Sequence, residues 1–193
     1  MSETKHAVRA RARRLAAALG PAERAARSRA LCDHLLRAPA FRDAVGLVGF
    51  VGRGHEPDTR PLLAAALEAG KRVFLPRVAS KDPPALVFVE VETLAGLDPG
   101  AFGIDEPVGP PAAAIPAASL VLVPGLAFDR RGHRLGHGAG FYDRALAGPL
   151  AGCPRAGVCL APFLFDEVPQ GGHDVPVHAI VTDEGWLPVP PAG

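Results

Sequence analysis

Short, uninterrupted apolar runs constrain the fold of this chain more than any other feature. The first run is AVGLVGFV at residues 44–51, and the most strand-like is SLVLVP at residues 119–124. Runs of this length without polar alternation are typical of strands that are buried on both faces of a sheet. Further strands are predicted at residues 73–78, 86–91, 156–160 and 179–182.

Segments with helical periodicity precede these runs and lie between them. Apolar residues recur at helical spacing over residues 4–19, and Gly20-Pro21 ends that helix and begins a second one, which stops before Pro39. Two more helices are predicted at residues 57–69 and 141–147. Buried strands that alternate with helices favour an α/β sandwich with a largely parallel sheet.

Composition bounds the class of protein. The chain has 193 residues, of which 48% are hydrophobic and 21% are charged, and this suits one domain over residues 1–193. No apolar run approaches the roughly 18 residues that cross a bilayer, and the charged N-terminus lacks an apolar signal core. Three widely spaced cysteines without a CxxC pair indicate reduced thiols. We therefore expect a cytoplasmic protein with no membrane partner, and a monomer.

The positive charge is concentrated in an N-terminal arm. Residues 1–42 hold ten Lys and Arg side chains against three acidic ones, although the net charge of the whole chain is only +1. Such an arm can bind nucleic acid or a polyanionic small ligand. It can equally be a solvated helical face, so charge alone leaves all three interpretations open.

A glycine-rich loop follows the strand predicted at residues 119–124. Gly136, Gly138 and Gly140 alternate just before a predicted helix, where backbone N–H groups can approach an anion closely. Arg134 supplies a cation for phosphate oxygens, and Asp143 a carboxylate for Mg²⁺. The pattern matches neither a Walker loop nor a dinucleotide fingerprint. A phosphate-binding loop and a simple tight turn are therefore equal alternatives on this evidence.

Two other carboxylates are candidates for a site. Glu56 lies where the first strand meets the following helix, so it can accept hydrogen bonds from an amino-bearing heterocycle or simply favour the helix dipole. Asp174 lies between His173 and His178, at a spacing that structural zinc sites do not use. We expect that loop to contribute one useful carboxylate, Asp174.

The segment VLVPGLAFDRRGHRLGHGAGFYDR resembles the signature of the 5-formyltetrahydrofolate cyclo-ligase family, also called 5,10-methenyltetrahydrofolate synthetases. Shorter stretches follow the family's order and spacing, namely KHAVR, GHEPDT, GKRVFLPRV, FGIDEP and HDVPVHAIVT. The match covers essentially the whole chain. It implies a three-layer α/β/α sandwich similar to the sugar-isomerase and CoA-transferase fold. It also implies a ligase of one-carbon folate metabolism that uses Mg²⁺ and ATP to convert 5-formyltetrahydrofolate to 5,10-methenyltetrahydrofolate.

The resemblance assigns ligands to residues. It places ATP on Lys5, Arg9, Arg134, Leu135, Gly136, His137, Gly138, Ala139, Gly140, Phe141 and Tyr142. It places the folate on Val51, Glu56, His137, Gly138, Ala139, Gly140 and Phe141. It assigns Mg²⁺ to Asp143 and Asp174, and the chemistry to Arg134 and Tyr142. Many relatives have Tyr or Arg at position 137, so the histidine there is a departure whose role the resemblance does not supply.

The implied reaction suits these residues. The N5-formyl oxygen is a poor leaving group until ATP phosphorylates it; N10 then attacks the phosphorylated formyl intermediate, and phosphate leaves beside ADP. Such a transfer needs positioning and charge stabilisation more than covalent help. Basic residues of the arm would also attract the glutamate or polyglutamate tail of a folate.

Three rival functions stay open from the sequence. One is a sugar-phosphate isomerase or acyl-CoA transferase on the same fold, without ATP. Another is a nucleic-acid-binding module built on the Arg-rich helices. That function would give the glycine-rich loop and Asp143 no role, so we expect no nucleic-acid partner. The third is a relative with a changed acceptor, which the residues at His137 and His178 would favour.

Overall fold

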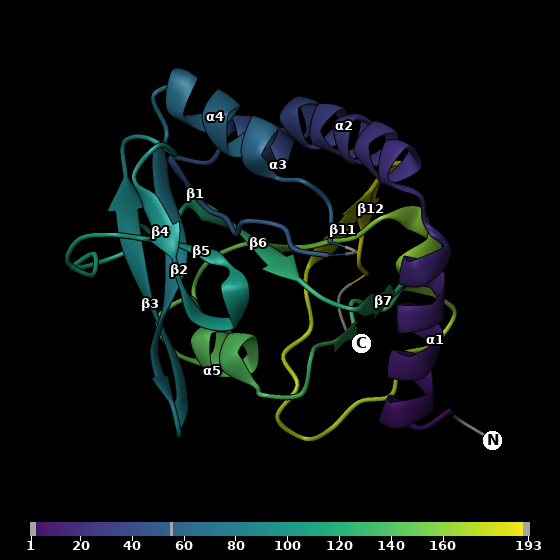
Figure 1. The fold of residues 1–193 in the computed structure, drawn as a ribbon. Helices are drawn as coiled ribbons and strands as arrows, with labels where there is room; N and C mark the ends of the chain where they lie inside the picture. Colours follow the sequence, from purple (N-terminus) through teal and green to yellow (C-terminus); the bar gives the residue numbers. More distant parts are fainter. Residues whose placement is uncertain (1–2, 55, 191–193) are drawn as a thin grey trace.

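One seven-stranded sheet organises the protein, as the computed structural model of residues 3–54 and 56–190 shows (Figure 1). The strand order is β12-β11-β9-β6-β1-β2-β3. The pairings from β11 across to β2 are parallel, whereas β12 and β3 pair antiparallel at the two edges. The predicted largely parallel sheet is therefore confirmed.

The strands of this sheet are close to the predicted ones, except at the ends. Their bounds are β1 Gly46–Val48, β2 Arg72–Lys81, β3 Pro84–Val91, β6 Ser119–Pro124, β9 Arg155–Val158, β11 Ala179–Thr182 and β12 Gly185–Pro188. The apolar run at 44–51 contributes only three residues to β1, because the chain then leaves the ladder and carries Phe50 and Val51 toward a cavity. The edge strand β12 was not predicted, since it is short and only partly buried.

Helices cover both faces of the sheet, which confirms the layered sandwich. Their bounds are α1 Lys5–Ala18, α2 Pro21–Arg37, α3 Pro39–Arg42, α4 Arg60–Glu68 and α5 Phe141–Ala147. In Figure 1, α2, α3 and α4 lie above the sheet and α5 lies below it. The one-turn helix α3 was not predicted, and α4 begins three residues later than expected, with Pro61 in its first turn.

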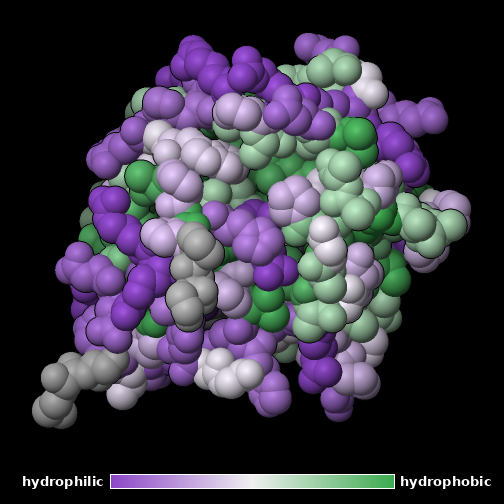
Figure 2. Space-filling model, turned by 180° about the vertical axis from the view of Figure 1, so that it is seen from behind, coloured by the Kyte–Doolittle hydropathy of each residue, from purple (hydrophilic) through white to green (hydrophobic). Residues whose placement is uncertain are grey.

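The helical layer is amphipathic. Leu31 and Leu35 of α2, and Leu62 and Leu63 of α4, are fully buried in the core. Figure 2 shows a mainly hydrophilic surface over this layer, with apolar side chains beneath it. No helix among residues 3–54 and 56–190 is both long and apolar enough to cross a bilayer.

Two small sheets flank the main one and were not predicted. The hairpin β4–β5 joins Leu97–Pro99 to Asp105–Pro107, with the 3-10 helix η1 (Ala101–Gly103) at its tip. A three-stranded sheet orders β10 (Leu164–Phe165), β7 (Ala127–Asp129) and β8 (Arg134–Leu135), and α1 packs against β7 and the 3-10 helix η2 (Ala161–Phe163). Strands of two or three residues are too short to show a period in the sequence.

A buried carboxylate fixes the turn between β7 and β8. Asp129 is fully buried and accepts backbone hydrogen bonds from Arg131, His133 and Val168, at 2.9 to 3.1 Å. Its second oxygen also lies 2.9 Å from His133 Nδ1. This turn sets the direction in which β8 enters the glycine-rich loop.

Candidate active site

A cavity of about 1030 Å³ opens where β1 and β6 end. Val51 follows β1 and Pro124 is the last residue of β6, as expected for a site beyond the carboxyl ends of parallel strands. Every site residue that the sequence suggested lines this cavity: Lys5, Arg9, Val51, Glu56, Arg134, Leu135, Gly136, His137, Gly138, Ala139, Gly140, Phe141, Tyr142, Asp143 and Asp174. The structure thus brings together residues that lie as far as 169 positions apart.

The glycine-rich loop needs its glycines for two reasons. Gly138 and Gly140 have backbone φ values of +112° and +77°, which residues other than glycine rarely adopt. A Cβ on Gly136 would lie 3.0 Å from the Arg134 guanidinium. The loop is therefore a tight turn that lines the cavity, and phosphate binding by it stays a prediction.

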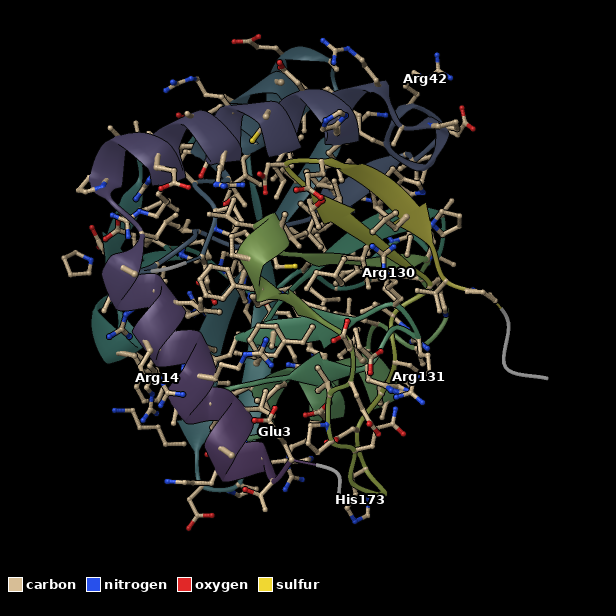
Figure 3. All side chains as sticks on the ribbon, turned by 90° about the vertical axis from the view of Figure 1, so that its right-hand side faces the viewer. Glu3, Arg14, Arg42, Arg130, Arg131 and His173 are labelled. Carbon is tan, nitrogen blue, oxygen red and sulfur yellow. The ribbon has the colours of Figure 1, made fainter. Side chains whose placement is uncertain are left out.

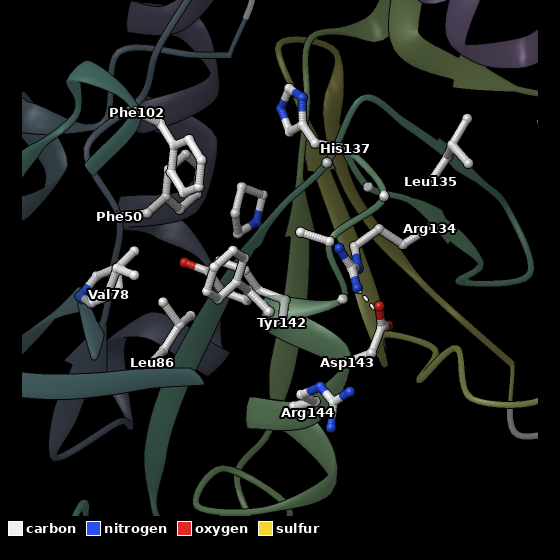
Figure 4. A pocket seen from close by; sticks show the side chains of 18 of the residues that line it. Phe50, Val78, Leu86, Phe102, Arg134, Leu135, His137, Tyr142, Asp143 and Arg144 are labelled. Carbon is white, nitrogen blue, oxygen red and sulfur yellow. Dashed lines mark hydrogen bonds and ion pairs between the residues drawn. The ribbon is translucent and has the colours of Figure 1, made fainter. Parts of the chain in front are cut away.

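Three cations reach the loop and its surroundings. Arg134 is almost completely buried, with a side-chain exposure of 6%, and its Nη2 donates to Asp143 Oδ1 at 2.6 Å (Figure 4). From α1, Arg9 Nε donates to the Gly136 carbonyl at 3.1 Å, and Lys5 Nζ donates to Asp174 Oδ2 at 2.5 Å. The basic arm is thereby fastened across the cavity.

The two candidate metal carboxylates are held in place by backbone N–H groups. Val175 N–H donates to Asp143 Oδ1 at 3.3 Å, and Gly171 N–H donates to Asp174 Oδ2 at 2.7 Å. Burial raises the pKa of Asp174, but the hydrogen bonds from Lys5 and Gly171 outweigh it and lower that pKa below its usual value. Nowhere in the described part of the chain do three or more His, Cys, Asp or Glu side chains converge as metal ligands.

Glu56 lies deep in the cavity wall, with 9% of its side chain exposed. The Arg53 N–H donates to its Oε2 at 3.0 Å. Burial nevertheless raises the pKa of Glu56 to about 7. At the rim, His137 Nε2 lies 4.0 Å from Glu56 Oε1, and partial desolvation together with Arg53 and Arg13 lowers the pKa of His137.

The far half of the cavity is apolar and was not predicted. Its lining includes Phe50, Leu75, Val78, Leu86, Phe102 and Ile104. The Tyr142 hydroxyl points toward this half in Figure 4, is buried, and has no hydrogen-bond partner among the described residues. Burial and the nearby Glu56 raise the pKa of Tyr142.

Four of these apolar residues lie in stretches that carry the family resemblance, namely Leu75 and Val78 in GKRVFLPRV, and Phe102 and Ile104 in FGIDEP. Phe102 belongs to the FGIDEP stretch, is half exposed at the tip of the β4–β5 hairpin, and packs edge-on against Phe141 with ring centroids 6.0 Å apart. The others lie within or next to strands, where an apolar side chain that lines a cavity looks the same as one in the core.

The two histidines near Asp174 do not form a metal site with it. His173 is exposed, although it borders the cavity (Figure 3). His178 lies outside the cavity, and its Nδ1 accepts a hydrogen bond from Arg155 N–H at 3.4 Å. The expectation that this loop contributes a single carboxylate, Asp174, agrees with this arrangement.

Comparison with known proteins places the chain in a family. The model of the 5-formyltetrahydrofolate cyclo-ligase family matches residues 1–183. The 5-formyltetrahydrofolate cyclo-ligase of Mycolicibacterium smegmatis is 40% identical over 141 residues, which cover 69% of this chain and 71% of that protein. The Escherichia coli K12 enzyme of the same name is 29% identical over 168 residues, 86% of this chain and 92% of that one.

Solved structures agree with this placement. The 5,10-methenyltetrahydrofolate synthetase of Aquifex aeolicus superposes with a TM-score of 0.84 at 29% identity, covering 98% of this chain and 94% of that one. The Mycoplasma pneumoniae protein of the same name shares the fold, with a TM-score of 0.71 at 20% identity over 94% of this chain and 99% of that one. The chain therefore belongs to the 5-formyltetrahydrofolate cyclo-ligase family of ligases.

Proposed function

We propose that this protein converts 5-formyltetrahydrofolate and ATP to 5,10-methenyltetrahydrofolate, ADP and phosphate, with Mg²⁺ as cofactor. One observation carries the proposal: a single cavity joins a half lined by cations and glycines to an apolar half. The first half suits a triphosphate, and the second suits the flat rings of a folate. An isomerase or a nucleic-acid module would have no use for both halves.

We assign the residues to the two ligands as the family resemblance implies. Lys5, Arg9 and Arg134 surround the loop from 135 to 142 and would hold the phosphates of ATP. Val51, Glu56 and the loop from 137 to 141 would contact the folate. Glu56, which would contact the folate, and Tyr142, which belongs to the phosphate loop, both line the cavity and interact electrostatically. The formyl group of the folate would therefore lie beside the transferred phosphoryl group.

The chemistry follows from this placement. The γ-phosphoryl group of ATP would move to the formyl oxygen, and ADP would leave. N10 would then attack the formyl carbon and release its proton to solvent, and the C–O bond would break as phosphate leaves. Arg134 would stabilise the charge on the transferred phosphoryl group. Because the raised pKa of Tyr142 keeps its hydroxyl protonated, that hydroxyl would donate a hydrogen bond to the formyl or phosphoryl oxygen.

The carboxylates fit Mg²⁺ in type and number. Mg²⁺ usually binds to one or two protein carboxylates and completes its shell with water and substrate phosphates. Asp143 and Asp174 line the phosphate half and would supply those carboxylates. When bound, Mg²⁺ would neutralise phosphate charge during the transfer. A cytoplasmic location, a monomeric state and the absence of a nucleic-acid partner stay predictions.

The direct test is to mix purified protein with 5-formyltetrahydrofolate and MgATP and to follow the near-ultraviolet absorbance of the methenyl product. We expect product only when ATP and Mg²⁺ are both present, with loss of activity on adding a chelator and recovery with excess Mg²⁺. Absence of product under conditions where an active cyclo-ligase works in parallel would refute the proposed function.

A further inference from the structure

Two ionisable side chains face each other, Glu56 in the cavity wall and His137 at the rim, and the function proposed above gives no role to the charge of His137. Glu56 comes from the loop after β1, and His137 from the loop after β8. The backbone N–H of Arg53 donates a hydrogen bond to Oε2 of Glu56. The other carboxylate oxygen, Oε1, lies 4.0 Å from His137 Nε2. Glu56 has 9% of its side chain exposed and His137 has 66%, so an enclosed carboxyl lies beside a group that exchanges protons with solvent.

Arginines from three parts of the fold act on the charge of His137. Arg9 and Arg13 come from α1, Arg53 from the loop of Glu56, and Arg134 from β8. Tyr142 of α5 lies close enough for its pKa to be raised by Glu56. The arginines disfavour a proton on His137, whereas the Glu56 carboxylate favours one.

We propose that His137 is a positioning residue whose protonated form keeps Glu56 as the carboxylate that the folate ring requires. A carboxylate can accept hydrogen bonds from two neighbouring N–H groups of an amino-bearing heterocycle, and a protonated carboxyl cannot. Where His137 is protonated, its charge stabilises the Glu56 carboxylate across the 4.0 Å between Nε2 and Oε1. The inference rests on the proposed function and deepens it, because it gives a role to the charge of His137, at a position where many relatives have Tyr or Arg.

The sign of the pH dependence follows from the charges. Burial raises the pKa of Glu56 to about 7, so folate binding should weaken as pH falls through neutrality. An imidazolium 4.0 Å away favours the carboxylate and extends binding to lower pH. At alkaline pH Glu56 is ionised with or without His137, so the charge of His137 should matter only on the acidic side.

Two substitutions at this position test the proposal. His137→Gln keeps similar bulk but cannot carry a charge, and His137→Arg carries one at every pH. The measurement is kcat and KM for 5-formyltetrahydrofolate at saturating MgATP, from about pH 5.5 to about pH 8.5. The acidic limb of kcat/KM should move up by about half to one pH unit in His137→Gln and down in His137→Arg. The change should appear in KM, and each profile is compared with the alkaline plateau of the same protein.

A matched exchange controls for the loss of a histidine. His6 is exposed on α1 and does not line the cavity, so His6→Gln should leave the profile unchanged. The inference is overturned if the acidic limb of His137→Gln coincides with that of the unchanged protein. An equal loss at every pH, persisting at the alkaline end, overturns it too, because that result indicates a contact independent of charge.

A second readout separates this inference from the proposed function. The carboxyl carbon of Glu56 can be titrated by ¹³C NMR in ligand-free protein, without substrate or turnover. We expect a higher midpoint in His137→Gln, and equal midpoints contradict the inference. Lack of cyclo-ligase activity in the unchanged protein, by contrast, refutes the proposed function while this comparison still decides the role of His137.

Discussion

Arg134 shows how a single residue can be held ready for an anion. Its guanidinium is almost completely buried, pairs with Asp143 through one nitrogen, and leaves Nε without a partner among the described residues. Burying a charge is costly unless its remaining donors are satisfied. A phosphoryl group in the cavity would supply the missing acceptors, so the resting ion pair orients the side chain for its ligand.

Replacing Arg134 by Ala should therefore abolish useful turnover. We expect kcat in the methenyl assay to fall by about 10²–10³-fold or more, because a preorganised donor to the transferred group is lost. Arg130→Ala is the matched control, since Arg130 is exposed, lies on the outer surface (Figure 3) and does not line the cavity.

Unfolding in urea separates loss of function from loss of fold in these two variants. Arg134→Ala leaves Asp143 without its ion-pair partner, so a modest drop in stability is expected beside the loss of turnover. A folded Arg134→Ala protein with normal kcat would contradict the role of this residue in phosphoryl transfer.

At the scale of elements, the loop between β8 and α5 depends on backbone conformation as much as on side chains. Gly140 caps α5 with φ of +77°, in the left-handed region, and nothing lies within 4 Å of the place where a Cβ would be. The cost of a side chain there is conformational and does not come from a clash. Few residues besides glycine adopt this conformation cheaply.

Gly140→Ala should lower the free energy of unfolding by about 1–2 kcal/mol and raise KM for ATP, because the loop loses its preferred conformation. Urea unfolding and steady-state kinetics measure the two effects. In Gly152→Ala, the control, the added methyl group also meets open space but the backbone needs no positive φ, so neither value should change appreciably. Equal behaviour of the two variants would contradict the account of the loop.

Elements were predictable where the sequence shows a period or a long apolar run. The helices α1 and α2 and the parallel strands β6, β9 and β11 were located to within a few residues, because burial fixes their patterns. The hairpin β4–β5 and the three-stranded sheet were not located, since strands of two or three residues are specified by tertiary contacts. Phe102 was missed for this reason: it reaches the cavity only because that hairpin forms.

At the scale of the whole molecule, the fold converts distant residues into one site. The parallel strands direct their carboxyl ends to one edge, and α1 lies across that edge through the Lys5–Asp174 and Arg9–Gly136 contacts. The resemblance to a family could name these polar residues one by one. Their shared cavity, its apolar half and the pairing of Glu56 with His137 required the three-dimensional arrangement.

The central claim is that this cavity brings the γ-phosphoryl group of ATP to the formyl oxygen of a folate. An isotope label tests it most directly: 5-formyltetrahydrofolate with ¹⁸O in the formyl group is turned over with unlabelled MgATP in unlabelled water. The inorganic phosphate is then analysed by mass spectrometry. We predict that each phosphate released carries the formyl ¹⁸O. Methenyl product formed with unlabelled phosphate, and the ¹⁸O found in water, would contradict the account.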